Sequence, residues 1–282
     1  MGGRGAKGEG WLVPPQLSEP TSSPRLFMSQ PLRRHLAAFA SLGEHAPQQA
    51  RAFFAWYALA TGEGALPPRL KALIALAVAH AVPCPYCLDA WTKGALERGA
   101  DVEECVEVAH VVAWAQARSA LLHGRVVLDQ ARRWSMHLPG PTHDEERYHH
   151  AGLAELEPLQ ASSAPRAHAG WVTYEAGVFA RAGAAHTSAP TEGTSEALPP
   201  GSALPYREKI LIAHALGASL PCPLLLQETA PLVTSSGWGP DEERESLHVA
   251  AALRAGATLA HAALAKEAAL STPSEVTPGG DT

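Results

Sequence analysis

The chain has 282 residues, of which 46% are hydrophobic, and it carries a net charge of −6 at neutral pH. This length can bury one large core or two ordinary ones, and two small domains are the expectation. The 22 Lys and Arg residues are scattered and form no basic stripe, so no nucleic-acid partner is predicted.

The two ends of the chain are predicted to be disordered, over residues 1–28 and 271–282. The first of these segments is rich in Gly, Pro and Ser and holds no apolar run long enough for a signal peptide. No stretch approaches the roughly 18 consecutive apolar residues of a membrane span, so no membrane partner is expected. Four cysteines are too few for a secreted disulfide scaffold of this length, which predicts a cytoplasmic protein.

From about Pro31 onward, Ala, Leu and Val recur at helical spacing and strand-like alternation is absent from the sequence, which predicts an all-α fold. Residues 35–66 indicate two helices divided between Glu44 and Pro47. Residues 66–82 form a nearly continuous apolar helix that its prolines start well. A helix so apolar must be buried.

The next two helices carry clear boundary signals. Pro85 suits the first position of a helix, and Gly99 suits its left-handed C-terminal cap. Asp101 and Glu104 then stand at capping-box spacing, which predicts the start of a long helix that reaches about residue 134.

The sequence contains an internal repeat. Residues 64–123 and 202–261 superpose without a gap at a shift of 138 residues, with 22 identities in 60 positions. We interpret the chain as a tandem duplication, with a first copy over 29–138 and a degenerate second copy over 139–270. A Pro-, Ser- and Gly-rich loop near 183–202 is predicted to be an insertion in the second copy.

The repeat also compares the cysteines of the two copies. Cys84 recurs as Cys222, whereas Leu225 stands where the first copy has Cys87. The fold therefore tolerates leucine at that position, which weakens the view that Cys87 is needed for packing.

Cys84 and Cys87 form a CxxC motif at the start of a predicted helix. Unpaired amides and the helix dipole favour a thiolate there, and the two sulfurs are within disulfide reach, so the motif indicates a redox dithiol. Zinc would need about four ligands, and no second CxxC or HxxxH stands near the motif. Two inert buried thiols are the remaining alternative.

Residues 66–113 resemble the core of the AhpD-like, carboxymuconolactone decarboxylase superfamily, with a proline-started helix, a CxxC, a helix ending in Gly-Ala and an acidic start to the next helix. Residues 53–67 and 72–90 resemble its arsenosugar biosynthesis-associated peroxidase-like branch. The resemblance implies a peroxiredoxin-type oxidoreductase that acts on a peroxide or disulfide, with an external thiol reductant and no cofactor or metal. It also implies a homo-oligomer and a link to arsenic metabolism.

The resemblance implies that Cys87 attacks the peroxide and that Cys84 resolves the product. The proton-relay Glu and His of the alkylhydroperoxidase members correspond to Ala72 and Trp91, and neither side chain can move a proton. His80, four residues before Cys84, is therefore the candidate base. A His in an apolar helix is nonetheless more often a hydrogen-bonded core residue.

Two other functions stay open. Lactone decarboxylation uses polar acid/base groups and does not depend on a CxxC, so the dithiol counts against it. A catalytically silent accessory protein is favoured by the missing Glu and His.

Two histidines and a third cysteine are predicted to be structural. His110 and His123 recur as His248 and His261 in the copy that lacks the dithiol, which argues for packing. Cys105 stands among glutamates that would raise a thiol pKa, so it is expected to be unreactive.

Overall fold

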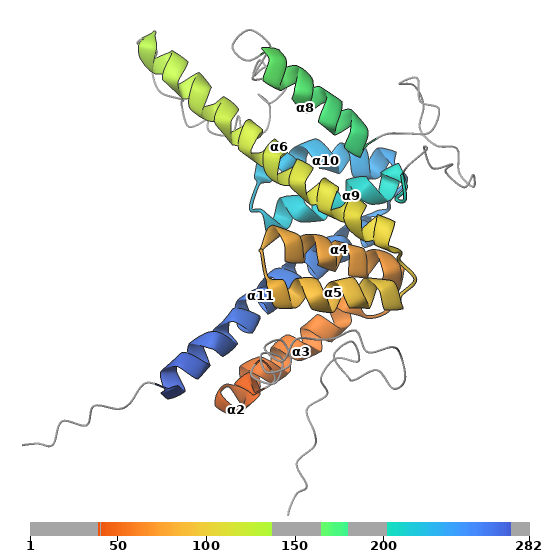
Figure 1. Cartoon of the computed structure of the whole chain (residues 1–282), viewed down its shortest axis with the longest axis vertical. Coiled ribbons are helices and arrows are strands. Elements are labelled where there is room, and N and C mark those ends of the chain that lie inside the picture. The colour runs from red at the N-terminus through yellow and green to blue at the C-terminus, as the bar shows by residue number, and fades with distance from the viewer. Residues whose placement is uncertain (1–38, 40, 137–164, 180–201, 272–282) are drawn as a thin grey trace, which may run out of the picture. The chain divides into compact units, whose positions relative to one another are not determined.

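The computed structural model describes residues 39, 41–136, 165–179 and 202–271 (Figure 1). All regular elements in these residues are α-helices, which confirms the predicted all-α class. In chain order they are α2 (Leu42–His45), α3 (Pro47–Thr61), α4 (Pro68–Ala81), α5 (Pro85–Glu97), α6 (Val102–Ser135), α8 (Pro165–Val178), α9 (Tyr206–Ser219), α10 (Pro223–Ser235) and α11 (Pro240–Ser271).

Contacts divide the chain into two compact units. One comprises Met1–Ala58 with Thr258–Thr282, and the other comprises Leu59–Ala257. The predicted N-terminal extension, loop insertion and C-terminal tail lie almost wholly outside the described residues. The predicted copy boundaries stay a prediction, and helices from both predicted copies contribute to the unit Leu59–Ala257.

The buried apolar helix is confirmed as α4. Pro67 has an extended backbone (φ −58°, ψ 142°) and precedes the first residue of the helix. Proline suits the start of a helix because the amide hydrogen that it lacks would have no partner within the helix there. Ten consecutive residues from Leu70 to Ala79 are buried. A helix covered on all sides needs no polar face, which explains why all of these residues except Lys71 are apolar.

The predicted boundaries of the following helices are also confirmed. Gly99 has φ 87°, in the left-handed region that favours glycine, and it separates α5 from α6. The amide of Glu104 donates to Asp101 Oδ1 at 2.7 Å, and the amide of Asp101 donates to Glu104 Oε2 at 2.9 Å. This reciprocal pair is the capping box.

Within the unit Leu59–Ala257, α4 packs on α5 and α9, α9 packs on α10, and α6 crosses both α4 and α9 (Figure 1). Helices α4, α5 and α6 begin 138 residues before α9, α10 and α11, respectively. The shift that aligns the two repeated sequences therefore also aligns two helix sets, a first set of α4, α5 and α6 and a second set of α9, α10 and α11. Gly237 (φ 78°) occupies the place of Gly99.

The other unit is described by its own contacts. Phe53 of α3 packs against Phe54, Trp56 and Tyr57, with ring centroids 5.4 to 6.3 Å apart. Lys266 of α11 donates to Ser41 Oγ at 2.6 Å. An aromatic cluster and the polar contacts of Lys266 with Ser41 and Glu44 thus characterise this unit.

Among the described residues, one helix, Pro240–Leu270, is long and apolar enough to cross a membrane, with a mean hydropathy of 1.2. Of the window that meets this criterion, 44% is buried within the structure. Core helices of water-soluble proteins meet the same criterion, so this helix is weak evidence for a span.

Candidate dithiol site

Cys84 and Cys87 lie at the N-terminus of α5. Cys84 is the N-cap residue (φ −99°, ψ 102°), and its Sγ accepts a hydrogen bond from the Cys87 amide at 3.4 Å. Neither cysteine is in a disulfide bond. Cys84 has 0% exposed surface, whereas Cys87 is half-buried, so an approaching reagent meets Cys87 first.

The surroundings of the two thiols differ in how well they stabilise a thiolate. A hydrogen bond with the Cys84 thiol, and then burial, raise the pKa of Cys87. Because the Cys84 sulfur also accepts the Cys87 amide hydrogen, negative charge is better stabilised on Cys84. The greater exposure of Cys87 therefore favours its sulfur as the attacking atom. The electrostatic surroundings instead favour Cys84 as the thiol that loses its proton first.

The acid/base groups expected from the sequence are arranged as follows. Helix α4 extends to Ala81, so His80 lies in its last turn, and burial lowers the pKa of the imidazole. Within the described residues, no hydrogen bond is seen from His80 to either thiol. Ala72 and Trp91 are buried, at 0% and 5% exposure, and neither supplies an ionisable group.

A buried lysine joins the two helix sets. Lys71 of α4 is 1% exposed, and its Nζ lies 2.5 Å from Glu245 Oε1 of α11 and 2.6 Å from the Gly62 carbonyl oxygen. The other oxygen of Glu245 accepts the Leu66 amide at 2.5 Å. One carboxylate thus neutralises a buried ammonium and satisfies a backbone amide just before α4.

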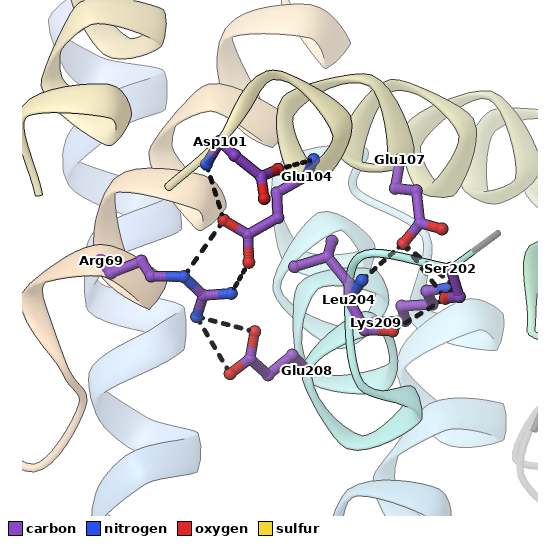
Figure 2. A network of polar contacts seen from close by, with 8 residues as sticks. All are labelled: Arg69, Asp101, Glu104, Glu107, Ser202, Leu204, Glu208 and Lys209. Atoms are coloured by element: carbon purple, nitrogen blue, oxygen red, sulfur yellow. Dashed lines mark hydrogen bonds and ion pairs between the residues drawn. The ribbon is translucent and has the colours of Figure 1, made fainter. Parts of the chain in front are cut away.

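The reverse arrangement occurs at Lys209 of α9, which is 2% exposed. Its Nζ lies 3.2 Å from Glu107 Oε2 of α6, and the same oxygen accepts the Leu204 amide at 2.7 Å (Figure 2). Lys71, Leu66 and Glu107 each stand 138 residues before their counterparts Lys209, Leu204 and Glu245. Each helix set therefore supplies a glutamate to the buried lysine of the other.

Two arginines extend this network. Arg69 lies between Glu104 and Glu208 and donates to both, with 3.1 Å between Nη1 and Glu208 Oε2 (Figure 2). Arg118 of α6 makes a bidentate contact to Glu228 of α10, at 2.7 and 2.8 Å. The sequence reasoning missed these pairs, and of their residues only Arg69 and Glu104 recur in the second helix set, as Arg207 and Glu242.

Cys222 occupies the N-cap position of α10 and is 0% exposed. Its Sγ lies 3.5 Å from His123 Nε2 of α6. The packing role predicted for His123 overlooked this contact, because aligning the two copies identifies equivalent residues and does not show which residues of one helix set meet those of the other. His110 is exposed, and its ring lies 6.3 Å from that of Tyr174 in α8.

A buried polar cluster lies between α9, α10 and α11. His214 Nδ1 is 2.8 Å from Thr229 Oγ1, and His214 Nε2 is 3.2 Å from Glu243 Oε1. Thr229 is 0% exposed, so its hydroxyl is closed to any substrate in this conformation. The first helix set has Leu76, Trp91 and Cys105 at the equivalent positions, and the sequence reasoning did not identify the cluster.

We expect the free energy of unfolding to fall as the pH is lowered from about 8 to about 5. Burial lowers the pKa of His214, an effect that Glu243 partly offsets. The unfolded chain therefore binds a proton near the ordinary histidine pKa of about 6.5, before the folded chain does. Stability is complete above that value and is lost as the pH falls towards the lower folded pKa.

Chemical denaturation at several pH values measures this effect. His214→Leu introduces the residue found at the equivalent position of the first helix set, Leu76. It should weaken the dependence of the free energy of unfolding on pH. The exposed His248→Gln is the matched control and should leave it unchanged. Equal profiles for parent and His214→Leu would contradict the assignment.

The remaining thiol behaves as the sequence predicts. Burial, followed by the carboxylates of Glu104 and Asp101, raises the pKa of Cys105. The predicted direction is correct, and burial is its largest cause. In the described ranges, no group of three or more His, Cys, Asp and Glu side chains is placed to hold a metal ion.

The helical architecture and the CxxC at the start of α5 define an all-α protein with a candidate dithiol site. The profile of the carboxymuconolactone decarboxylase family matches residues 47–130, which include both thiols. Uncharacterized protein 4 in the cox locus of Paracoccus denitrificans is 39% identical over 94 residues, which are 32% of this chain and 85% of that protein. No solved structure matches the chain. The chain belongs to the carboxymuconolactone decarboxylase family.

Proposed function

We propose that Cys84 and Cys87 are a redox-active dithiol and that the protein is a thiol-dependent peroxidase or disulfide oxidoreductase. The observation that carries the proposal is the Cys87 amide directed at the Cys84 sulfur, at the N-terminus of α5. Helix N-termini stabilise thiolates, and a CxxC there is the arrangement of many disulfide oxidoreductases. Family membership supports the helical core on which the pair is built.

The peroxidase reaction balances with the dithiol as a monoanion. The Cys87 proton passes to the Cys84 thiolate, and the Cys87 thiolate attacks the peroxide, so that the O–O bond breaks. Cys87 becomes a sulfenic acid, and the leaving alkoxide takes a proton from solvent. The Cys84 thiol then displaces the sulfenic oxygen as water, and an external thiol reduces the disulfide.

The second helix set is proposed to be the degenerate copy of a tandem duplication that acts as a built-in partner subunit. Its support is the reciprocal pairing of Lys71 with Glu245 and of Lys209 with Glu107. Further homo-oligomerisation and a role in arsenic or arsenosugar metabolism belong to the same proposal. Both rest on the sequence resemblance.

We expect mild oxidation to protect Cys84 and Cys87 from alkylation together, because a disulfide consumes both thiols. Peptide mass spectrometry after thiol labelling, with and without peroxide, measures this. Cys105 is the internal control, and its extent of labelling under native conditions should be the same with and without peroxide. Free labelling of Cys87 after peroxide, without peroxide consumption by the parent protein, would reject the redox function.

His80 is proposed as the base that removes the first proton from the pair. Its lowered pKa keeps the imidazole neutral and able to accept a proton at neutral pH. His80→Ala should slow the reaction of the dithiol with peroxide by about 10²- to 10⁴-fold, the loss typical of a missing general base. Stopped-flow measurement of the single-turnover rate tests this, and an unchanged rate would leave His80 a core residue.

A catalytically silent accessory protein is the second candidate. The buried Ala72 and Trp91 favour it, because the positions of the family's proton relay hold no acid or base. The raised pKa of Cys87 favours it too, because a less acidic thiol forms the attacking thiolate less readily. A dithiol that forms its disulfide only over hours, with no turnover, would support this function. Lactone decarboxylation stays a third alternative, favoured by the family name alone.

A further inference from the structure

Two cysteines begin equivalent helices, but their sulfurs have different neighbours. The Cys84 sulfur accepts the amide of Cys87. The sulfur of Cys222 makes no such cap hydrogen bond in the described chain, and Leu225 takes the place of the second thiol. The neighbour of Cys222 is instead the imidazole of His123, at 3.5 Å.

The contact is built from both helix sets. His123 belongs to α6 and Cys222 to α10, and the bidentate pair between Arg118 and Glu228 joins the same two helices. Residue numbers rise along α6 and fall along α10 between the two contacts, so the helices run in opposite directions where they meet. The ion pair and the sulfur–imidazole contact thus lie at two points along the same antiparallel crossing.

The pair places a thiol beside a side chain that can act as a base. An imidazole within hydrogen-bond reach can accept the thiol proton, and the N-terminus of the 13-residue helix α10 stabilises the resulting thiolate. Cys222 is 0% exposed whereas His123 is exposed, so the imidazole is the member of the pair that meets solvent. The reaction proposed below therefore requires the His123 side chain to turn aside, so that a small reagent reaches the sulfur.

We propose that Cys222 and His123 form a second, single-thiol site that reacts with small peroxides independently of Cys84 and Cys87. His123 Nε2 takes the thiol proton, the thiolate attacks one peroxide oxygen, and the O–O bond breaks. Cys222 becomes a sulfenic acid, and the imidazolium returns the proton to the leaving oxygen, which departs as water or an alcohol. An external thiol reduces the sulfenic acid through a mixed disulfide.

The test uses a chain in which Cys84, Cys87 and Cys105 are replaced by Ser, leaving Cys222 as the single thiol of the original four. Hydrogen peroxide is added with a dimedone-type sulfenic acid trap, and the adduct is followed by mass spectrometry. We expect an adduct on Cys222. His123→Ala should slow its formation by about 10²-fold, the loss typical of a missing general base.

Free imidazole distinguishes a proton acceptor from a packing residue. It should restore part of the rate lost in His123→Ala, a loss of about 10²-fold, because it supplies a proton acceptor from solution. The matched control is His110→Ala on the same helix. Its rate of adduct formation should equal that of the parent and should not change when imidazole is added.

If the triple variant does not fold, the same trap is used on the full chain, and peptide mapping by mass spectrometry shows whether the adduct is on Cys222. No adduct on Cys222 in the full chain would overturn the proposal, as would a His123→Ala rate equal to that of the parent or unmoved by imidazole. Because the triple variant lacks the dithiol, the result is independent of the function proposed for Cys84 and Cys87.

Discussion

We expect Glu245→Gln to lower the free energy of unfolding by about 3–5 kcal/mol, the usual cost of removing one partner from a buried ion pair. The variant leaves the ammonium of Lys71, which is 1% exposed, with the Gly62 carbonyl oxygen and a neutral amide. Desolvation of an ammonium without its counter-ion is the physical cause. Urea denaturation followed by circular dichroism measures the change.

Two comparisons sharpen this experiment. Glu107→Gln is the mirror variant and should cost less, because Lys209 keeps Ser202 Oγ at 2.8 Å and the Val178 carbonyl oxygen at 3.0 Å. Arg244→Gln breaks an exposed pair with Asp241 on α11 and should change stability by less than about 1 kcal/mol. If Glu245→Gln costs no more than Arg244→Gln, the buried pair does not hold the two helix sets together.

We expect Cys87→Ser to abolish peroxide consumption and Cys84→Ser to stop it after one turnover. A serine hydroxyl at position 87 is not ionised near neutral pH and cannot attack the peroxide. Serine at position 84 preserves the helix cap but cannot displace the sulfenic oxygen, so Cys87 remains a sulfenic acid. Both variants are made with Cys222→Ser, so that a reaction at Cys222 does not obscure the result.

Peroxide loss under single-turnover and multiple-turnover conditions, with a small dithiol as reductant, separates the two outcomes. Cys105→Ser is the control and should match the parent. A Cys87→Ser protein that consumes peroxide within twofold of the parent rate would remove Cys87 from the reaction. Reversed phenotypes would assign the attack to Cys84, the thiol that the electrostatics favour as thiolate.

Some features of this protein follow from short stretches of sequence. Pro67 and Pro85 precede or begin helices because proline lacks an amide that those positions leave without a helical partner. Gly99 separates two helices because the turn needs a positive φ. The Asp101 capping box follows from the reach of two short side chains to nearby amides. Each of these depends on groups only a few residues apart.

The placement of the dithiol was predictable for the same reason. Cys84 and Cys87 lie within one helical turn, so local geometry fixes the contact between the Cys87 amide and the Cys84 sulfur. The protonation of the pair was not predictable, because burial and the hydrogen bond between the thiols raise the pKa of Cys87. Burial depends on the helices packed around the site.

The tertiary structure alone decided which residues of one helix set meet those of the other. The repeat showed that Lys71 and Lys209 are equivalent, but not that each pairs with a glutamate of the opposite set. It likewise aligned Cys222 with Cys84 without placing His123 beside it. Such pairs lie about 100 residues or more apart in the chain, at distances set by the crossing of packed helices. The sequence therefore determined the helices and the dithiol, whereas the packing of one set on the other decided the charge pairs and the second thiol contact.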